Sequence, residues 1–151
     1  MGDIPTGLDV EMIQWFLYRK EHLDPQHDKS LRTIKEYERE LMQFVEQLVQ
    51  YSEDIEIDID HIIEGSLFQS LSPRHIRRYQ EWLAERSPYV QKNGSYSPAA
   101  LARKTVIIKN FLQFMYEVEY IQEPLHKGLF TTTVRNKEEF LRFTKELKSI
   151  S

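Results

Sequence analysis

Apolar side chains recur along most of the chain at the three- and four-residue spacing of an α-helix. The spacing predicts a first helix over about residues 8–23, and Pro25 marks its end because the residue before a proline disfavours helical conformation. A second helix is predicted over about residues 30–51. Its apolar side consists of Leu31, Ile34, Tyr37, Leu41, Phe44, Val45, Leu48 and Val49.

Two Ser-Pro pairs predict the starts of two further helices. Serine is a good N-cap, and proline suits the first helical turn, where a backbone N–H has no intrahelical partner. Ser72-Pro73 predicts a helix to about residue 85, and Ser97-Pro98 opens the longest apolar helix, to about residue 119. Between these helices, the Pro, Asn and Gly of residues 87–95 predict a loop.

Residues 53–64 alternate acidic residues with isoleucines and contain no basic residue. The alternation is compatible with a short strand, but the chain offers that strand no partner, so an extended loop leading into a short helix is favoured. Residues 129–136 are predicted to be a β-rich linker, and residues 137–147 form a final amphipathic segment. The predicted fold class is all-α, with four main helices.

Composition narrows the range of functions. The chain has 151 residues, which suits one domain with a single core, and no cysteine, which excludes disulfides, thiolate metal sites and cysteine nucleophiles. The acidic run lacks the Gly and Glu of a calcium loop, because Ile59 and Gly65 occupy those positions. No metal or cofactor is therefore expected.

No apolar run approaches the roughly 20 residues of a membrane span, and no basic leader opens the chain, so we expect a cytoplasmic, nucleoid-associated protein.

The formal net charge of −4 argues against a nucleic-acid partner, but the charge is unevenly distributed. Residues 1–71 carry 6 basic and 16 acidic side chains, residues 72–110 carry 8 and 2, and residues 111–151 carry 6 of each. The three segments therefore have net charges of −10, +6 and 0. The middle of this acidic chain is basic.

Two groups of basic residues fall on predicted helices. Arg32, Lys35 and Arg39 lie within roughly a 60° arc of the second helix. Arg103 and Lys104 lie in the first turns of the helix that begins after Ser97, where helix-end N–H groups, two cations and small alanines suit phosphate binding. Ordinary lysine snorkelling on a surface helix explains the position of Lys104 equally well, so both interpretations remain open.

His75 and Arg78 have the His-x-x-Arg spacing of some phosphoryl-transfer sites. They fall in the first turns of the helix capped at Ser72, and no nucleophile lies beside them by spacing, so a solvated basic face is favoured over a catalytic site. The other histidines, such as His22 and His61, are scattered and form no ligand pair.

Taken in order, these features resemble the N-terminal core-binding domain of tyrosine recombinases, the phage integrase and Xer-type family. The family's first bundle helix typically reads S-x-x-T-x-x-x-Y-x-x-x-L-x-x-F-x-x-x-L, and the matching residues here are Ser30, Thr33, Tyr37, Leu41, Phe44 and Leu48. The family's last bundle helix matches at Ser97, Arg103, Lys104, Lys109, Phe111, Phe114 and Tyr116. The exit turn departs from the family, since Glu123 replaces the usual Asn before Pro124.

The resemblance implies a four-helix SAM-like bundle over residues 30–129, which clamps one side of a double-stranded attachment site while other recombinase protomers assemble in a synaptic complex. Residues 1–29 would be an extra N-terminal helix and linker, and residues 130–151 a linker and the start of a C-terminal catalytic domain. That domain would hold the Arg, Lys, His-x-x-Arg and Tyr machinery of strand exchange, so we expect no enzymatic activity from this chain, no small-molecule substrate and no membrane partner.

We hypothesise that the DNA surface combines both basic groups with the last loop. Its residues are Arg32, Lys35, Arg39, Lys92, Asn93, Arg103, Lys104 and Lys109. Lysine and arginine would contact phosphates, and sequence preference would come from Arg or Lys at guanine edges, with Asn93 as a supporting hydrogen-bond donor. Two other functions remain open. The chain could be a helical protein-interaction module, or a regulator that binds the recombination site without recombining it.

Overall fold

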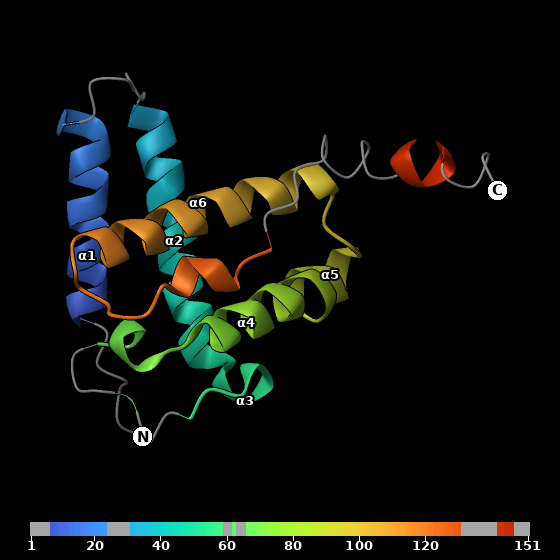
Figure 1. Cartoon of the computed structure of the whole chain (residues 1–151), viewed down its shortest axis with the longest axis horizontal. Helices are drawn as coiled ribbons and strands as arrows, with labels where there is room; N and C mark the ends of the chain where they lie inside the picture. Colours follow the sequence, from blue (N-terminus) through green and yellow to red (C-terminus); the bar gives the residue numbers. More distant parts are fainter. Residues whose placement is uncertain (1–6, 24–30, 59–61, 63–65, 131–141, 147–151) are drawn as a thin grey trace.

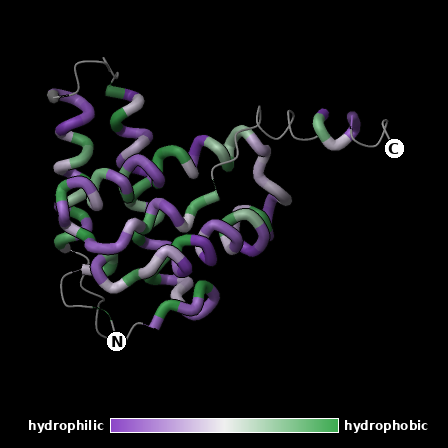
Figure 2. The backbone as a smooth tube through the Cα atoms, in the orientation of Figure 1, coloured by the Kyte–Doolittle hydropathy of each residue, from purple (hydrophilic) through white to green (hydrophobic). Residues whose placement is uncertain are grey.

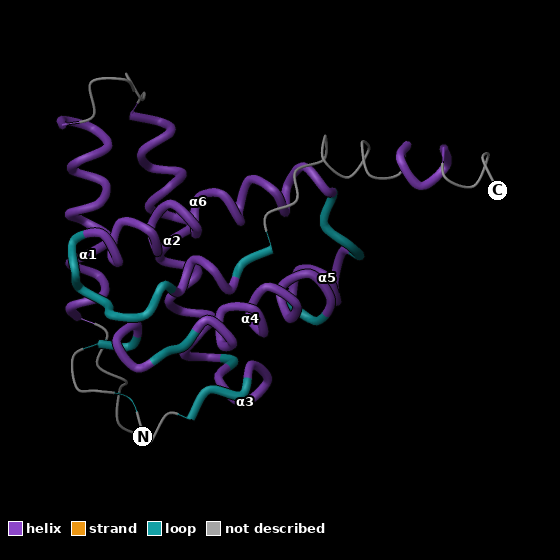
Figure 3. Tube along the Cα trace, in the orientation of Figure 1, coloured by secondary structure: helices purple, strands orange, loops and turns teal. Residues whose placement is uncertain are grey.

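The computed structural model describes residues 7–23, 31–58, 62, 66–130 and 142–146. Within these residues every regular element is a helix or a helical turn, and no strand is present (Figure 3). The prediction of an all-α fold is therefore confirmed. The predicted linker over residues 129–136 and the final amphipathic segment lie largely outside the described residues, where only residues 142–146 are seen, as a helical turn.

Four long helices dominate the described part of the chain, and short helices connect them (Figure 1). Their ends agree with the predicted ends to within two residues when the π-helical turn that follows α1 is counted with it. The elements in chain order are α1 (Gly7–Tyr18), the π-helical turn η1 (Arg19–Leu23), α2 (Leu31–Gln50), α3 (Ser52–Ile55), the 3-10 turn η3 (Phe68–Ser70), α4 (Pro73–Glu85), α5 (Pro88–Asn93), α6 (Pro98–Glu117) and the 3-10 turn η4 (Leu125–Gly128).

The long helices share one core. α1 packs along α2, and α6 crosses and contacts both of them (Figure 1). α4 contacts α3, α5 and η4, and η4 also packs against α6. Figure 2 shows hydrophilic and hydrophobic positions alternating along these helices, as expected where each helix buries one side. The buried cluster accordingly includes side chains of α1, α2, α4 and α6.

A continuous series of aromatic rings crosses this core. Phe16 of α1 lies 5.5 Å from Phe111 of α6, and Phe111 lies 5.7 Å from Phe68, measured between ring centroids. Phe68 lies 5.6 Å from Phe44 of α2, which lies 4.8 Å from Tyr79 of α4. Such tilted and edge-to-face pairs add about 0.5–1.5 kcal/mol each beyond the burial of their surface. The rings therefore set how the four long helices cross.

The two predicted Ser-Pro helix starts are confirmed. Ser97 Oγ accepts a hydrogen bond from the Ala100 N–H at 3.1 Å. At the start of α4, the Ser72 N–H donates to His75 Nδ1 at 3.0 Å. Burial and the nearby Arg78 and Arg74 lower the pKa of His75, which favours the neutral ring that can accept this bond at Nδ1. The histidine of the His-x-x-Arg pair thus serves as a helix cap.

The loop predicted over residues 87–95 is wrong, because α5 occupies most of it. Pro88 takes the first helical position after Ser87, as in α4 and α6, and Ser87 Oγ donates to the Leu83 carbonyl at 2.7 Å. Gly94 then ends the helix at a φ of 84°, a conformation that favours glycine. The Asn-Gly pair that suggested a loop marks only the end of a short helix.

The order predicted for residues 53–64 also needs correction. A short helix, α3, comes first, where the start of a loop was predicted, and the short helix predicted at the end of this stretch falls largely on residues outside the described part. Glu56 adopts the left-handed conformation, with a φ of 62°, and reverses the chain so that Ile55 and Ile57 are both buried. Alternating isoleucines here reflect a capped helical turn. Residues 59–61 and 63–65 lie outside the described part.

A buried carboxylate, Asp9, joins α1 to the segment before α4. Its oxygens accept hydrogen bonds from the Leu67 N–H at 2.6 Å, the Phe68 N–H at 3.4 Å, the Ser66 hydroxyl at 3.3 Å and the Tyr120 hydroxyl at 3.1 Å. Burial raises the pKa of Asp9, and these donors oppose that rise. Burial likewise raises the pKa of Tyr120 to about 12, so its hydroxyl keeps the proton that it donates. Asp9 thus links α1 to residues 66–68 and to Tyr120, which are far apart in the sequence.

We expect Asp9→Asn to lower the free energy of unfolding by about 1–3 kcal/mol in urea denaturation, because an amide N–H₂ would face donors that now bond a carboxylate oxygen. Glu11→Gln is the matched control, since Glu11 is an exposed acid on the same helix. Its effect should stay within about 0.5 kcal/mol. Equal effects of the two substitutions would contradict the role assigned to Asp9.

Candidate nucleic-acid interface

The structure brings together part of the predicted DNA surface. Arg32 and Arg39 on α2 and Arg103 on α6 gather around one carboxylate, that of Glu36. Arg103 Nε and Nη2 donate to the two carboxylate oxygens at 2.6 and 2.7 Å, a bidentate pair. The hydrogen bond from Arg103, with the charges of Arg103, Arg39 and Arg32, lowers the pKa of Glu36. Three arginines thus act on Glu36, which forms an ion pair with only one of them, Arg103.

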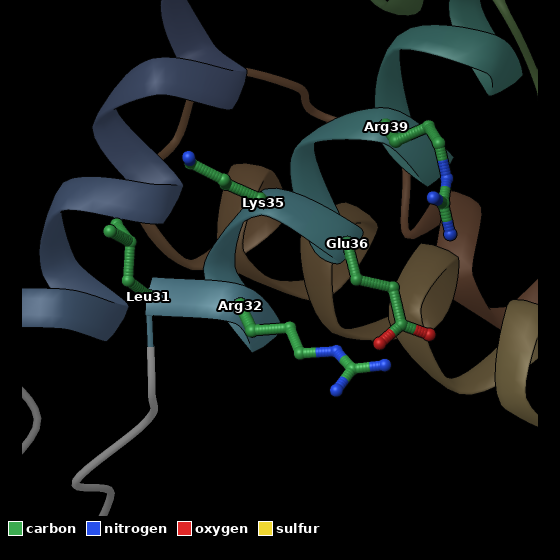
Figure 4. Close-up of a pocket in the computed structure, with 5 residues that line it drawn as sticks. All are labelled: Leu31, Arg32, Lys35, Glu36 and Arg39. Atoms are coloured by element: carbon green, nitrogen blue, oxygen red, sulfur yellow. The ribbon is translucent and has the colours of Figure 1, made fainter.

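A groove of about 630 Å³ lies along this side of α2. Its lining residues are Leu31, Arg32, Lys35, Glu36 and Arg39 (Figure 4). Figure 4 shows Arg32, Glu36 and Arg39 extending to one side of α2, whereas Lys35 points toward α1. Among the ion pairs between described residues, none includes Arg32 or Arg39. These two arginines therefore offer guanidinium groups to an incoming anion.

Lys104 is held inside the protein surface. Its Nζ lies 2.7 Å from Glu40 Oε2 on α2, and only 17% of its side chain and 16% of that of Glu40 are exposed. The same Nζ lies 3.5 Å from Gln43 Oε1 and 5.5 Å from the centre of the Tyr96 ring. The sequence left two interpretations of Lys104 open, a phosphate ligand or a lysine that snorkels along the protein surface. This geometry favours the second, because the ammonium group pairs with Glu40. A phosphate contact by Lys104 would require displacement of Glu40.

The remaining predicted residues lie elsewhere. Lys92 and Asn93 are exposed at the end of α5, and Asn93 Nδ2 donates to the Tyr89 carbonyl at 3.2 Å. Lys109 is half-buried further along α6, close enough to His126 to contribute, after burial and Lys127, to lowering the pKa of that histidine. The structure therefore does not gather all eight predicted residues on one patch.

Arginines in and just after α4 bind neighbouring parts of the chain. Arg77 Nε donates to the Gly128 carbonyl of η4 at 2.7 Å, and Arg78 Nε lies 3.1 Å from Glu56 Oε2. Arg86 Nη2 donates to the carbonyl oxygen of Asp54 at 3.2 Å. Many of the basic side chains of residues 72–110 thus form hydrogen bonds or ion pairs with α2, α3 and η4 or with residues next to them.

Sequence reasoning missed the acidic partners of the basic residues. Glu36 and Glu40 lie one turn apart on α2 and meet Arg103 and Lys104, which are adjacent on α6. The available signal was the opposite net charge of the two chain segments, which is as compatible with internal pairing as with a DNA surface.

Comparison with known proteins finds no family model, curated protein or solved structure that matches this chain. The resemblance to tyrosine recombinases therefore stays a prediction. In the described residues, no helix is long and apolar enough to cross a membrane. The same part of the chain contains no group of three or more His, Asp or Glu residues arranged to hold a metal ion.

The two ion pairs between α2 and α6 should differ in strength. Because Glu40 and Lys104 are largely shielded, we expect a double-mutant cycle with Glu40→Gln and Lys104→Met to give a coupling of about 1–2 kcal/mol in the free energy of unfolding. The matched cycle with Glu36→Gln and Arg103→Met should give less than about 1 kcal/mol, since that pair is more exposed. A larger coupling for the exposed pair would contradict this assignment.

Proposed function

We propose that this chain binds duplex DNA through the exposed side of α2 and the N-terminal half of α6, as the core-binding domain of a site-specific tyrosine recombinase. The observation that carries the proposal is the gathering of three arginines around the single carboxylate of Glu36. Guanidinium groups bind phosphates through the same two parallel hydrogen bonds by which Arg103 holds Glu36. Since an exposed ion pair contributes only about 0–1 kcal/mol, a DNA phosphate can replace that carboxylate.

In this proposal Arg32, Arg39 and Arg103 make the principal phosphate contacts. Lys92 adds a further contact from the exposed end of α5. Lys104 and Lys109 have smaller roles, because the first is paired with Glu40 and the second is half-buried beside η4. About three to four contacts correspond to a slope of log affinity on log salt near −3, at roughly −0.9 per phosphate.

The recombinase part of the proposal rests on the resemblance of the sequence. The ends of α2, α4 and α6 fall where that resemblance expects helix boundaries, which supports a SAM-like arrangement. The partners would be an attachment-site duplex and further protomers, and a C-terminal catalytic domain would carry out strand exchange. This chain then contributes affinity and position, and no chemistry.

A second candidate, a protein-interaction module, is favoured by the outer side of α1. Three large apolar side chains there are between 45% and 53% exposed: Leu8, Trp15 and Tyr18. Partly exposed apolar groups gathered on one helix are typical of protein contacts. A regulator that binds the recombination site without recombining it would use the same DNA surface, so the DNA experiment below separates the protein-interaction module from both DNA-binding alternatives.

Arg39→Gln should weaken binding to a short duplex several-fold at about 50 mM salt and reduce the magnitude of the salt slope by about one, as loss of one phosphate contact requires. Glu36→Gln should strengthen binding, because it removes the carboxylate that competes with phosphate for Arg103. Fluorescence anisotropy across a salt series measures both effects.

The matched control is Arg74→Gln, which removes an exposed arginine of α4 outside this cluster. It should leave the affinity and the salt slope close to those of the unchanged chain. Absence of duplex binding at about 50 mM salt, or equal losses for Arg39→Gln and Arg74→Gln, would refute the proposed surface.

A further inference from the structure

Two tyrosines stack at the junction of α5 and α6. The Tyr89 and Tyr96 ring centroids are 4.1 Å apart, and the ring planes differ by 11°. Tyr96 is half-buried, with its ring near Lys104 Nζ and a hydrogen bond to Ser87, whereas Tyr89 is 46% exposed. Tyr96 therefore acts as the fixed support, and Tyr89 presents a large aromatic surface toward solvent.

The stack forms one wall of a second groove, of about 510 Å³, whose opposite wall is α2. The α2 wall contributes three side-chain amides, those of Gln43, Gln47 and Gln50. The Tyr79 hydroxyl donates to Gln47 Oε1 at 2.7 Å and so fixes one of these amides from the core side. Amides offer both donors and acceptors, which suits the mixed edges of a nucleobase.

The lining of this groove and its surroundings differ in net charge. Two cations, Arg39 and Lys104, and two acids, Glu40 and Glu46, line the groove, so the charges of its lining residues sum to zero. A phosphate gains nothing from entering such a groove, whereas an uncharged aromatic group can stack there at little electrostatic cost. Lys92, exposed three residues after Tyr89 on α5, adds positive charge outside it.

Arg39 connects this groove with the one along α2, because it lines both of them. A strand whose phosphate is held by Arg39 would therefore lie at the edge of the groove that the tyrosines line. The two grooves therefore suit the backbone and a displaced base of the same strand.

We infer that the second groove binds one unpaired nucleobase of a DNA strand, stacked on the exposed face of Tyr89, with the adjoining phosphate at Arg39. This inference rests on the proposed DNA-binding function and extends it from intact duplex to distorted or unpaired DNA. Stacking on an aromatic ring accepts every base, so the site distinguishes unpaired from paired DNA without reading sequence.

The test compares a fully paired duplex with the same duplex carrying one unpaired 2-aminopurine, in titrations of the whole chain. The unpaired probe should bind about tenfold more tightly than the paired one, and its fluorescence should fall as the base stacks. Tyr89→Ala should remove both effects and leave the affinity for paired duplex unchanged, whereas Tyr89→Trp should retain them. Tyr18→Ala, which removes a tyrosine 53% exposed on α1, is the control and should change nothing.

The outcomes separate this site from the proposed function. Binding of paired duplex with no gain for the unpaired base overturns the site and leaves duplex binding intact. Tyr89-dependent binding of the unpaired probe alone supports the site and refutes duplex binding, and absence of all binding refutes both. Tyr89-dependent binding of a proline-rich peptide that displaces the probe overturns the site in favour of a peptide groove.

Discussion

The structure depends on the way α2 and α6 cross over a line of buried aromatic rings. Phe44 of α2 and Phe111 of α6 both contact Phe68, a residue of the short η3 turn between them in the core. All three rings are at most 1% exposed. Because close-packed rings tolerate little sliding, this contact fixes the helices both along and around their axes. Every polar contact between α2 and α6 then follows from that crossing.

The same crossing of α2 and α6 explains the uneven distribution of charge along the chain. The acidic segment and the basic segment fold against each other, as Glu36 meets Arg103 and Glu40 meets Lys104 across the α2–α6 contact. What remains exposed is a small arginine cluster, since Arg32 and Arg39 belong to none of the ion pairs between described residues. A net-negative protein can carry such a cluster, and its binding would then depend strongly on salt.

Helix positions could be predicted from the sequence because their signals are local. Proline after serine marks the start of α4 and α6, and the apolar period identifies the buried sides. α5 was missed although Ser87-Pro88 repeats the same start signal, since Pro88 was interpreted, together with Asn93 and Gly94, as a loop residue. Prediction from local sequence failed where a helix-start signal and a helix-end signal lie within one short segment.

The candidate site could be predicted only in part, because its contacts join distant residues. The Glu36–Arg103 pair spans 67 positions and the Asp9–Leu67 hydrogen bond spans 58, so neither follows from spacing along one helix. The basic stripe of α2 is visible in sequence, but whether each cation is paired depends on the acids that the crossing places opposite it. The tyrosine pair was likewise not predicted, since Tyr96 lies in the turn between α5 and α6, and that turn decides whether its ring meets Tyr89.

The most direct measurement follows arginine side-chain N–H signals by NMR while duplex DNA is added to the chain. We expect the Nε–Hε signals of Arg32, Arg39 and Arg103 to shift together and in proportion to occupancy. Arg77, which is bonded to the Gly128 carbonyl on another side of the protein, should not shift. Unchanged signals for all three clustered arginines, or a larger shift for Arg77, would contradict a DNA surface on α2 and α6.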